Sequence, residues 1–197
     1  MKKIIVILML FVMATRAWAV DYEVIWGDDF GGLDLIGTME DPDTLLMTGG
    51  TGHSLNVSAW STAIIHDTDS INISETTGGI WDIDTHSYGE LTINDGEFYD
   101  LSANGYSTIE LHGGDIFGSL TISAPTAWAH IFGYGFNNDP FPGSPLTGFW
   151  SGGAPFSINL VDDTISTYDQ IVFHEIPEPA SIILLGLGGL LLRKRKL

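Results

Sequence analysis

The sequence predicts an all-β fold, a short β-solenoid with an aromatic-rich cap, followed by a single C-terminal hydrophobic helix. Three observations favour it: short alternating stretches recur along the chain, Gly, Asn, Asp and Ser separate them, and the recurrence has a period of about 20 residues. In a solenoid each repeat is one turn of a coil and buries its apolar side chains against the next turn. An antiparallel β-sandwich, which also has a strand about every 8 to 12 residues, is the alternative.

The first element, residues 1–19, has the pattern of a secretory signal peptide. Lys2 and Lys3 precede a short apolar stretch, and a small-x-small cleavage site follows at Ala17 and Ala19. The apolar stretch is too short for a typical membrane span. We therefore expect signal peptidase to cleave after this segment, so that the rest of the chain is exported.

The predicted rungs of the solenoid occupy residues 45–126. Four stretches share the pattern apolar, any residue, apolar, polar, and they begin at Leu45, Ile71, Leu91 and Ile109. A second short strand recurs as "LNVSA" from Leu55 and "LTISA" from Leu120. Because side chains alternate between the two faces of a strand, Ile109 is expected to face the interior and Thr108 the outside.

Residues 127–175 differ from the rungs and are predicted to form a cap. They are rich in aromatic residues, Gly and Pro, fit no rung, and end in two alternating strands over residues 156–161 and 170–176. A solenoid needs its last rung covered. The aromatic residues expected to form the core of this cap are Trp128, Phe132, Tyr134, Phe136, Phe149 and Trp150. Residues 20–175 are thus predicted to be one exported domain.

The charge distribution narrows the range of partners. None of the seven Lys and Arg residues lies between Ala17 and Leu192, whereas all 25 Asp and Glu residues do. A body without Lys or Arg has no guanidinium or ammonium group to hold phosphate, which argues against nucleic acid as a partner. Because the chain has no Cys, it forms no disulfide and has no thiol chemistry.

The sequence indicates no catalytic residue, and we expect that the protein is not an enzyme. It has no HExxH zinc motif and no G-x-S-x-G nucleophile motif. His66 and His86 stand at the same distance before two repeat units and are expected to stack on adjacent rungs. No cofactor is predicted, although calcium is a candidate ligand if carboxylates of neighbouring rungs converge. The carboxylates concerned are Asp67, Asp69, Asp82 and Asp84.

The C-terminal residues 176–197 combine a short apolar run with a basic end. The run over residues 180–192 would form a helix of about 20 Å, against a hydrocarbon core of about 30 Å. The cations after it favour the cytoplasmic side, which leaves the body outside. This cytoplasmic basic anchor consists of Arg193, Lys194, Arg195 and Lys196.

The tail resembles the PEP-CTERM sorting signal. The residues that carry the resemblance are Pro177, Glu178, Pro179 and Ala180, followed by the Leu- and Gly-rich run and the basic cluster. The resemblance implies recognition by a membrane protease-transpeptidase of the exosortase type and cleavage near the motif. It also implies a bacterium that secretes polysaccharide, and hence extracellular polysaccharide as a partner. The body looks like that of other proteins of this kind, whose caps contain a "HIFGYGF" stretch, and this implies no known activity.

These features together predict an exported structural or adhesive protein of the bacterial envelope or extracellular matrix. It would cross the inner membrane, be anchored there by its C-terminal helix, and then reach the cell surface or the exterior. A glycan-binding module or a carbohydrate-active enzyme on a β-helix is one alternative. An ice-binding protein is the other, because similar tails occur on some ice-binding proteins, although the Thr residues here form no repeated T-x-T row.

Overall fold

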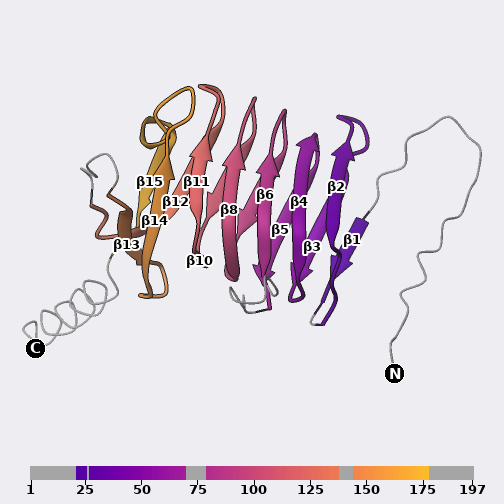
Figure 1. Ribbon diagram of the computed structural model, residues 1–197, viewed down its shortest axis with the longest axis horizontal. Helices are drawn as coiled ribbons and strands as arrows, with labels where there is room; N and C mark the ends of the chain where they lie inside the picture. The colour runs from indigo at the N-terminus through magenta and orange to yellow at the C-terminus, as the bar shows by residue number, and fades with distance from the viewer. Residues whose placement is uncertain (1–20, 26, 70–78, 138–143, 178–197) are drawn as a thin grey trace, which may run out of the picture.

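The computed structural model describes residues 21–25, 27–69, 79–137 and 144–177, which form fifteen β-strands and one short 3-10 helix (Figure 1). The strands are β1 (Asp21–Val24), β2 (Gly32–Gly37), β3 (Thr44–Thr48), β4 (Gly52–Ala59), β5 (Thr62–Asp67), β6 (Ile80–Thr85), β7 (Glu90–Ile93), β8 (Glu97–Ala103), β9 (Thr108–Leu111), β10 (Asp115–Ile116), β11 (Ser119–Ile122), β12 (Trp128–Tyr134), β13 (Leu146–Trp150), β14 (Pro155–Val161) and β15 (Ile171–Glu175), and the helix is η1 (Tyr168–Gln170).

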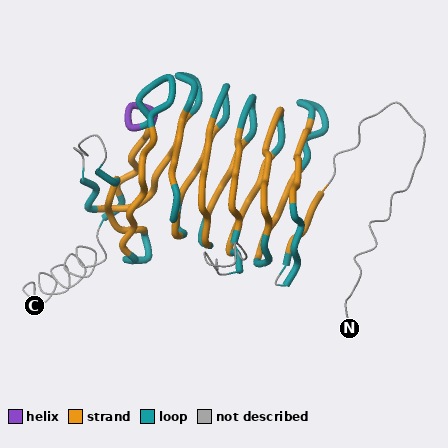
Figure 2. The backbone as a smooth tube through the Cα atoms, in the orientation of Figure 1, coloured by secondary structure: helices purple, strands orange, loops and turns teal. Residues whose placement is uncertain are grey.

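The strands belong to one open sheet with two arms (Figures 1 and 2). The first arm contains β1, β3, β5, β7, β9 and β12, and the second arm contains β2, β4, β6, β8 and β11. Neighbours within each arm pair in parallel. The antiparallel pairs of β13 with β12 and with β14 join the arms, because β14 also pairs with β11. The predicted all-β class is therefore confirmed.

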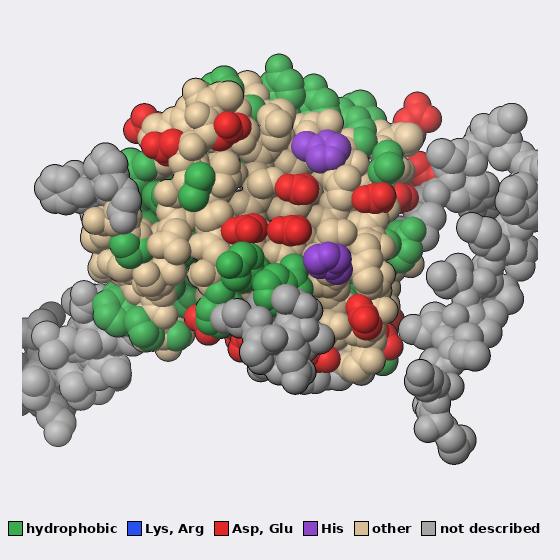
Figure 3. All heavy atoms as spheres, in the orientation of Figure 1, with side chains coloured by type: hydrophobic (Ala, Val, Ile, Leu, Met, Phe, Trp, Pro, Cys, Tyr) green, Lys and Arg blue, Asp and Glu red, His purple; other side chains and the backbone are tan. Residues whose placement is uncertain are grey.

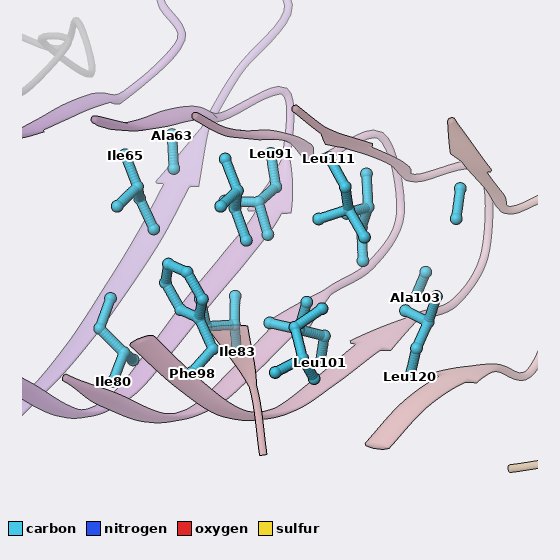
Figure 4. Close-up of a cluster of buried hydrophobic side chains, with 14 of the residues drawn as sticks. Ala63, Ile65, Ile80, Ile83, Leu91, Phe98, Leu101, Ala103, Leu111 and Leu120 are labelled. Carbon is cyan, nitrogen blue, oxygen red and sulfur yellow. The ribbon is translucent and has the colours of Figure 1, made fainter. Parts of the chain in front are cut away.

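The core lies between the two arms (Figure 4), where buried aliphatic side chains point toward one another. In the first arm, the pairing places Ala63, Leu91 and Ile109 in one inward row. In the second arm, Ile83 and Leu101 are in register across neighbouring strands. Burying a Leu or Ile side chain contributes about 1.5 to 3 kcal/mol. The repeated inward rows therefore stabilise each turn of the chain against the next.

The alternation predicted from the sequence is confirmed in the strands that it identified. Ile109 is fully buried, whereas Thr108 on the same strand is only partly buried. Leu55 and Leu120 lie in one row of the second arm, which runs through β4, β6, β8 and β11. The two strands predicted near the end of the body correspond to β14 and β15.

Strand β12 corrects the prediction that residues after Thr126 fit no rung. It continues the first arm, and Ala129 and Ile131 pair in register with residues of β9. The large aromatic residues of β12 are at its outward positions, whereas its inward residues include Ala129 and Ile131. The strand therefore has an aromatic-rich sequence although its inward face resembles that of the other strands. Among the aromatics assigned to a cap core, Trp150 is buried, but Trp128 and Phe149 are 38% and 42% exposed.

A second correction concerns the repeat unit assigned to Ile71, which lies outside the described residues. In the structure, Ala63 occupies the place between Leu45 and Leu91 in the first arm. His66 and His86 therefore do not stack on adjacent rungs. His66 lies in β5 of the first arm and pairs with Asn94, with 3.3 Å between Nδ1 and Nδ2, whereas His86 follows β6 of the second arm.

The two predicted terminal elements lie outside the described residues. The signal peptide with Ala17 and Ala19, the helix over residues 180–192 and the basic anchor therefore stay predictions. Of the residues that carry the sorting resemblance, only Pro177 is described. Within the described ranges, we find no helix with the length and apolar character needed to cross a membrane.

Candidate functional site

Three turns of the same construction connect the second arm to the first. They span residues 58–61, 86–89 and 104–107, and in each the fourth N–H donates to the first carbonyl, at 3.1, 3.0 and 3.4 Å respectively. The second residue has a left-handed φ in every case: 55° at Ala59, 61° at Ser87 and 69° at Gly105. The third residue is aromatic, and these are Trp60, Tyr88 and Tyr106.

A small residue at the fourth position sets the shape of each turn. Ser61 and Ser107 are fully buried, and their hydroxyls donate to the carbonyls of Ser58 and Asn104 at 2.7 and 2.9 Å. At the equivalent Gly89, a Cβ atom would lie 2.2 Å from the carbonyl oxygen of Val57. Each turn is thus held tightly against the body, and its aromatic side chain is left to project outward.

The three projecting side chains form an exposed aromatic ladder, defined here as Trp60, Tyr88 and Tyr106. The ring centroids of Trp60 and Tyr88 are 4.2 Å apart with planes 2° from parallel. Those of Tyr88 and Tyr106 are 5.1 Å apart at 8°. The three side chains are 39%, 43% and 59% exposed in chain order. Figure 3 shows hydrophobic side chains along the edge where these turns lie.

A groove of about 630 Å³ lies beside the ladder, across β6, β8 and the turns that follow them. We refer to it as the corner groove; its lining residues are Asn56, Asp84, Thr85, His86, Ser87, Tyr88, Ser102, Asn104, Gly105 and Tyr106. Asn56, Asp84 and Ser102 stand in register on three neighbouring strands. The Ser102 hydroxyl donates to the Asp84 carboxylate, while the buried Oδ1 of Asn56 has no hydrogen-bond partner. The volume is in the range of small-ligand sites.

The face around the groove is strongly negative. Figure 3 shows acidic side chains over the central strands of the second arm. Asp82 and Asp100 are opposite each other on β6 and β8. Partial burial, and then the like charges of Asp100 and Asp84, raise the pKa of Asp82. The groove therefore offers hydrogen-bond acceptors and negative charge, and the exported body has no Lys or Arg to offset them.

The proposed calcium ligands are not brought together. In the part of the chain that the structure describes, no group of three or more His, Asp or Glu side chains is placed to hold a metal ion. Asp67 ends β5 of the first arm, whereas Asp82 and Asp84 lie in β6 of the second. The Asp69 carboxylate instead accepts the Gly50 N–H at 3.0 Å.

A pair of histidines lies on the first arm, between β12 and β15. His130 Nδ1 and His174 Nε2 are 2.8 Å apart. His174 also stacks on Phe132, which stacks on His112, with centroid distances of 4.2 and 4.0 Å. Burial, and then the neighbouring His174, lower the pKa of His130, while Glu110 opposes the shift. Contacts in this cluster join His174 of β15 to His130 and Phe132 of β12 and so stabilise the position of the last strand.

Comparison with known families identifies the segment that follows the body. Residues 175–196 match the model of the PEP-CTERM protein-sorting motif. The chain carries a PEP-CTERM sorting signal. The predicted resemblance is thus confirmed, and the motif marks the chain as an exported, surface-sorted protein and a substrate of an exosortase-type enzyme. A comparison with curated proteins and one with solved structures gave no match.

The PEP-CTERM match begins inside the folded body. Its first residue, Glu175, is the last residue of β15 and pairs with Gly133 of β12. The N–H of Ile176 donates to the Gly133 carbonyl at 2.8 Å. The sorting signal therefore follows the last strand without an intervening linker among the described residues.

The aromatic ladder and the corner groove were missed by the sequence reasoning. The signal was present as three tetrapeptides, "SAWS" from Ser58, "HSYG" from His86 and "NGYS" from Asn104. Each has an aromatic third residue and a small fourth residue. The strands that follow the three tetrapeptides are in register through Ala63, Leu91 and Ile109. The tetrapeptides are recognised as equivalent once Ala63, and not Ile71, is taken as the repeat position before Leu91.

Proposed function

We propose that this chain is an exported adhesive protein, which its sorting signal brings to the cell surface and which holds extracellular polysaccharide in the corner groove. The PEP-CTERM motif supports the surface location. The adhesive role rests on the corner groove, where an aromatic ladder runs beside a row of hydrogen-bond acceptors.

We infer that the body which presents this groove is a short β-solenoid. Parallel, in-register pairing from one turn of the chain to the next supports this interpretation in both arms. So does the recurrence of one turn geometry at three successive corners. Stacked repeats give a rigid and extended surface, which suits a protein that binds a polymer.

Polysaccharide fits the chemistry of the groove better than other polymers. Sugar hydroxyls donate hydrogen bonds, and the Asp84 carboxylate, which lines the groove, accepts them. Tyr side chains combine an apolar ring with a hydroxyl, a combination suited to sugars, which have apolar C–H faces and polar rims. A polyanion such as nucleic acid is repelled by a chain with a net charge of −18.

The groove is proposed to bind polysaccharide without cleaving it. Glycoside hydrolysis ordinarily uses two carboxyl groups that flank the scissile bond. Asp84 is the carboxylate among the residues that line the groove, and it accepts a hydrogen bond from Ser102. A single engaged carboxylate suits ligand binding, so we assign no catalytic residue.

The proposal is tested by retention of the native host's extracellular polysaccharide on immobilised full-length chain in mild detergent. We expect Tyr88→Ala to weaken retention roughly three- to tenfold, since the loss of one hydrogen bond costs about 0.5 to 1.5 kcal/mol. Tyr99→Ala is the matched control, because Tyr99 stacks on Trp81 outside the groove. If the unmodified chain retains no polysaccharide, or if both variants lose retention equally, the adhesive function is wrong.

A further inference from the structure

The corner groove and the aromatic ladder beside it repeat with the spacing of the strands; Tyr88 and Tyr106 line the groove, and Trp60 continues the ladder past it. Each of three successive turns of the chain presents a polar residue and, four positions later, an aromatic one. These pairs are Asn56 with Trp60, Asp84 with Tyr88, and Ser102 with Tyr106. Neighbouring strands are about 4.8 Å apart. A ligand that uses all three pairs must therefore repeat its own contacts at nearly that interval.

The ladder offers ring edges to a ligand because its ring faces are occupied. Tyr88 lies between Trp60 and Tyr106, nearly parallel to both, at centroid distances of 4.2 and 5.1 Å. In Tyr88, the middle ring, what remains accessible is the outer edge with its hydroxyl group, whereas Trp60 and Tyr106 at the ends of the ladder are each stacked on one face. Hydroxyl groups at the ring edges can form hydrogen bonds along a polymer. Because both faces of Tyr88 are covered by neighbouring rings, a sugar has no room to stack flat on it.

We propose that the corner groove binds an extended, uncharged polysaccharide with equatorial linkages, which runs across the strands with about one sugar per turn of the solenoid. This inference rests on the proposed function and names its ligand class. Chains of 1,4-linked pyranoses in which both linkage bonds are equatorial are straight ribbons that advance by about one strand spacing per sugar, so successive sugars meet successive turns. Chains of α-1,4-linked glucose, in which one linkage bond is axial, coil and lose this register after one or two sugars.

Charge and hydrogen bonding both favour an uncharged chain. The Asp84 carboxylate lines the groove, and Asp82 and Asp100 lie on the same strands nearby. A uronate at any of these turns would face like charge with no Lys or Arg side chain in the exported body to offset it. A neutral sugar instead supplies hydroxyl donors to the Asp84 carboxylate.

The test compares glucose oligomers that differ only in linkage. Calorimetry with the full chain in mild detergent measures Kd for β-1,4-linked and α-1,4-linked oligomers of two to six glucose units. We expect Kd for the β-linked series to fall with each added unit up to about three or four, since residues of three neighbouring strands, β4, β6 and β8, line the groove. The α-linked oligomers should bind at least tenfold more weakly, and β-linked oligomers oxidised to uronates should bind more weakly at low salt than at high salt.

Removal of the hydroxyls tests the ring edges without disturbing the ladder. In Tyr88→Phe/Tyr106→Phe the rings stay stacked, and we expect Kd for the β-linked oligomers to rise roughly threefold for each hydroxyl lost. Tyr99→Phe, which removes a hydroxyl outside the groove, should leave Kd unchanged. A double variant that binds as tightly as the unmodified chain would overturn the assignment of the ring edges as contacts.

The remaining outcomes separate this inference from the proposed function. Equal binding of α- and β-linked oligomers, or a β-linked series with no dependence on length, would overturn the one-sugar-per-turn register. If neither series binds but the native polysaccharide is still retained through Tyr88, the ligand class is wrong and the adhesive function stands. If the native polysaccharide is not retained either, both fail.

Discussion

Asp82 illustrates how crowding of carboxylates on the acidic face lowers the stability of the folded protein. Its carboxylate faces Asp100 across β6 and β8, and its pKa is raised by partial burial and by its acidic neighbours. The folded protein therefore binds this proton more tightly than the unfolded chain does. Stability then falls as pH rises through the range between the unfolded pKa, about 3.9, and the higher folded value, and the penalty is fully present at neutral pH.

We predict that Asp82→Asn raises the free energy of unfolding at pH 7, by less than about 1 kcal/mol because the side chain is solvated. The gain should shrink as pH falls through the unfolded pKa, about 3.9, and vanish well below it, where the carboxyl is protonated in both states. Asp34→Asn is the matched control, because Asp34 faces Asn56 on the next strand and not a carboxylate. Denaturant unfolding at several pH values measures the effect, and equal gains from both variants would refute a local origin.

At this scale, the sequence predicted which residues face inward but not which ones form the candidate site. Ile109 was assigned correctly because alternation within one strand requires no knowledge of the neighbouring strands. The aromatic ladder depends on the register between turns of the chain, and Trp60 and Tyr88 are 28 residues apart. A small inward residue, Ala63, made the repeat that follows Trp60 hard to recognise.

The elements of the fold are stabilised by inward rows that leave no space for a charge. We predict that Ile109→Asp costs several kcal/mol, enough to unfold a marginally stable domain, because it buries a carboxylate without a partner. Thr108→Asp, on the outward side of the same strand, should cost less than about 1 kcal/mol. Thermal unfolding monitored by circular dichroism compares the two. If both variants are tolerated equally, the register of β9 against β7 and β12 is wrong.

Individual elements were predictable where polar and apolar residues alternate, and not where the outward residues are large. β14 was found because its inward residues, Phe156 and Ile158, alternate with the polar outward residues Ser157 and Asn159. β12 was mistaken for part of an irregular cap because Trp128 and Phe132 occupy outward positions. The connection between the two arms, in which β13 pairs with β12 and β14, could not be predicted in the same way. It depends on contacts between strands, and no local sequence pattern specifies it.

The whole molecule must tolerate a large uncompensated charge. With 25 Asp and Glu residues and no Lys or Arg between Ala17 and Leu192, repulsion opposes compaction. We predict that the melting temperature of the full chain in mild detergent rises when sodium chloride increases from 0.01 to 0.1 M, because the Debye length falls from about 30 to about 10 Å. No response to sodium would mean that repulsion is already relieved by solvation.

Calcium provides the control for that experiment. At matched ionic strength, millimolar calcium should give no further rise in melting temperature, since the described residues contain no group of acidic and histidine side chains placed to hold a metal ion. A distinct rise with calcium would indicate a site that includes residues outside the described ranges, and would restore the calcium hypothesis.

The central claim is that the body is delivered to the cell surface by a sorting signal that is then removed. The motif over residues 175–196 begins at the last residue of β15, so cleavage near Pro177 would leave the folded body complete. Intact-mass measurement of the mature protein from its native host tests this most directly. We predict a mass that lacks residues 1–19 and the basic tail. Recovery of surface material that still contains Arg193–Leu197 would contradict the claim and indicate a permanent membrane anchor.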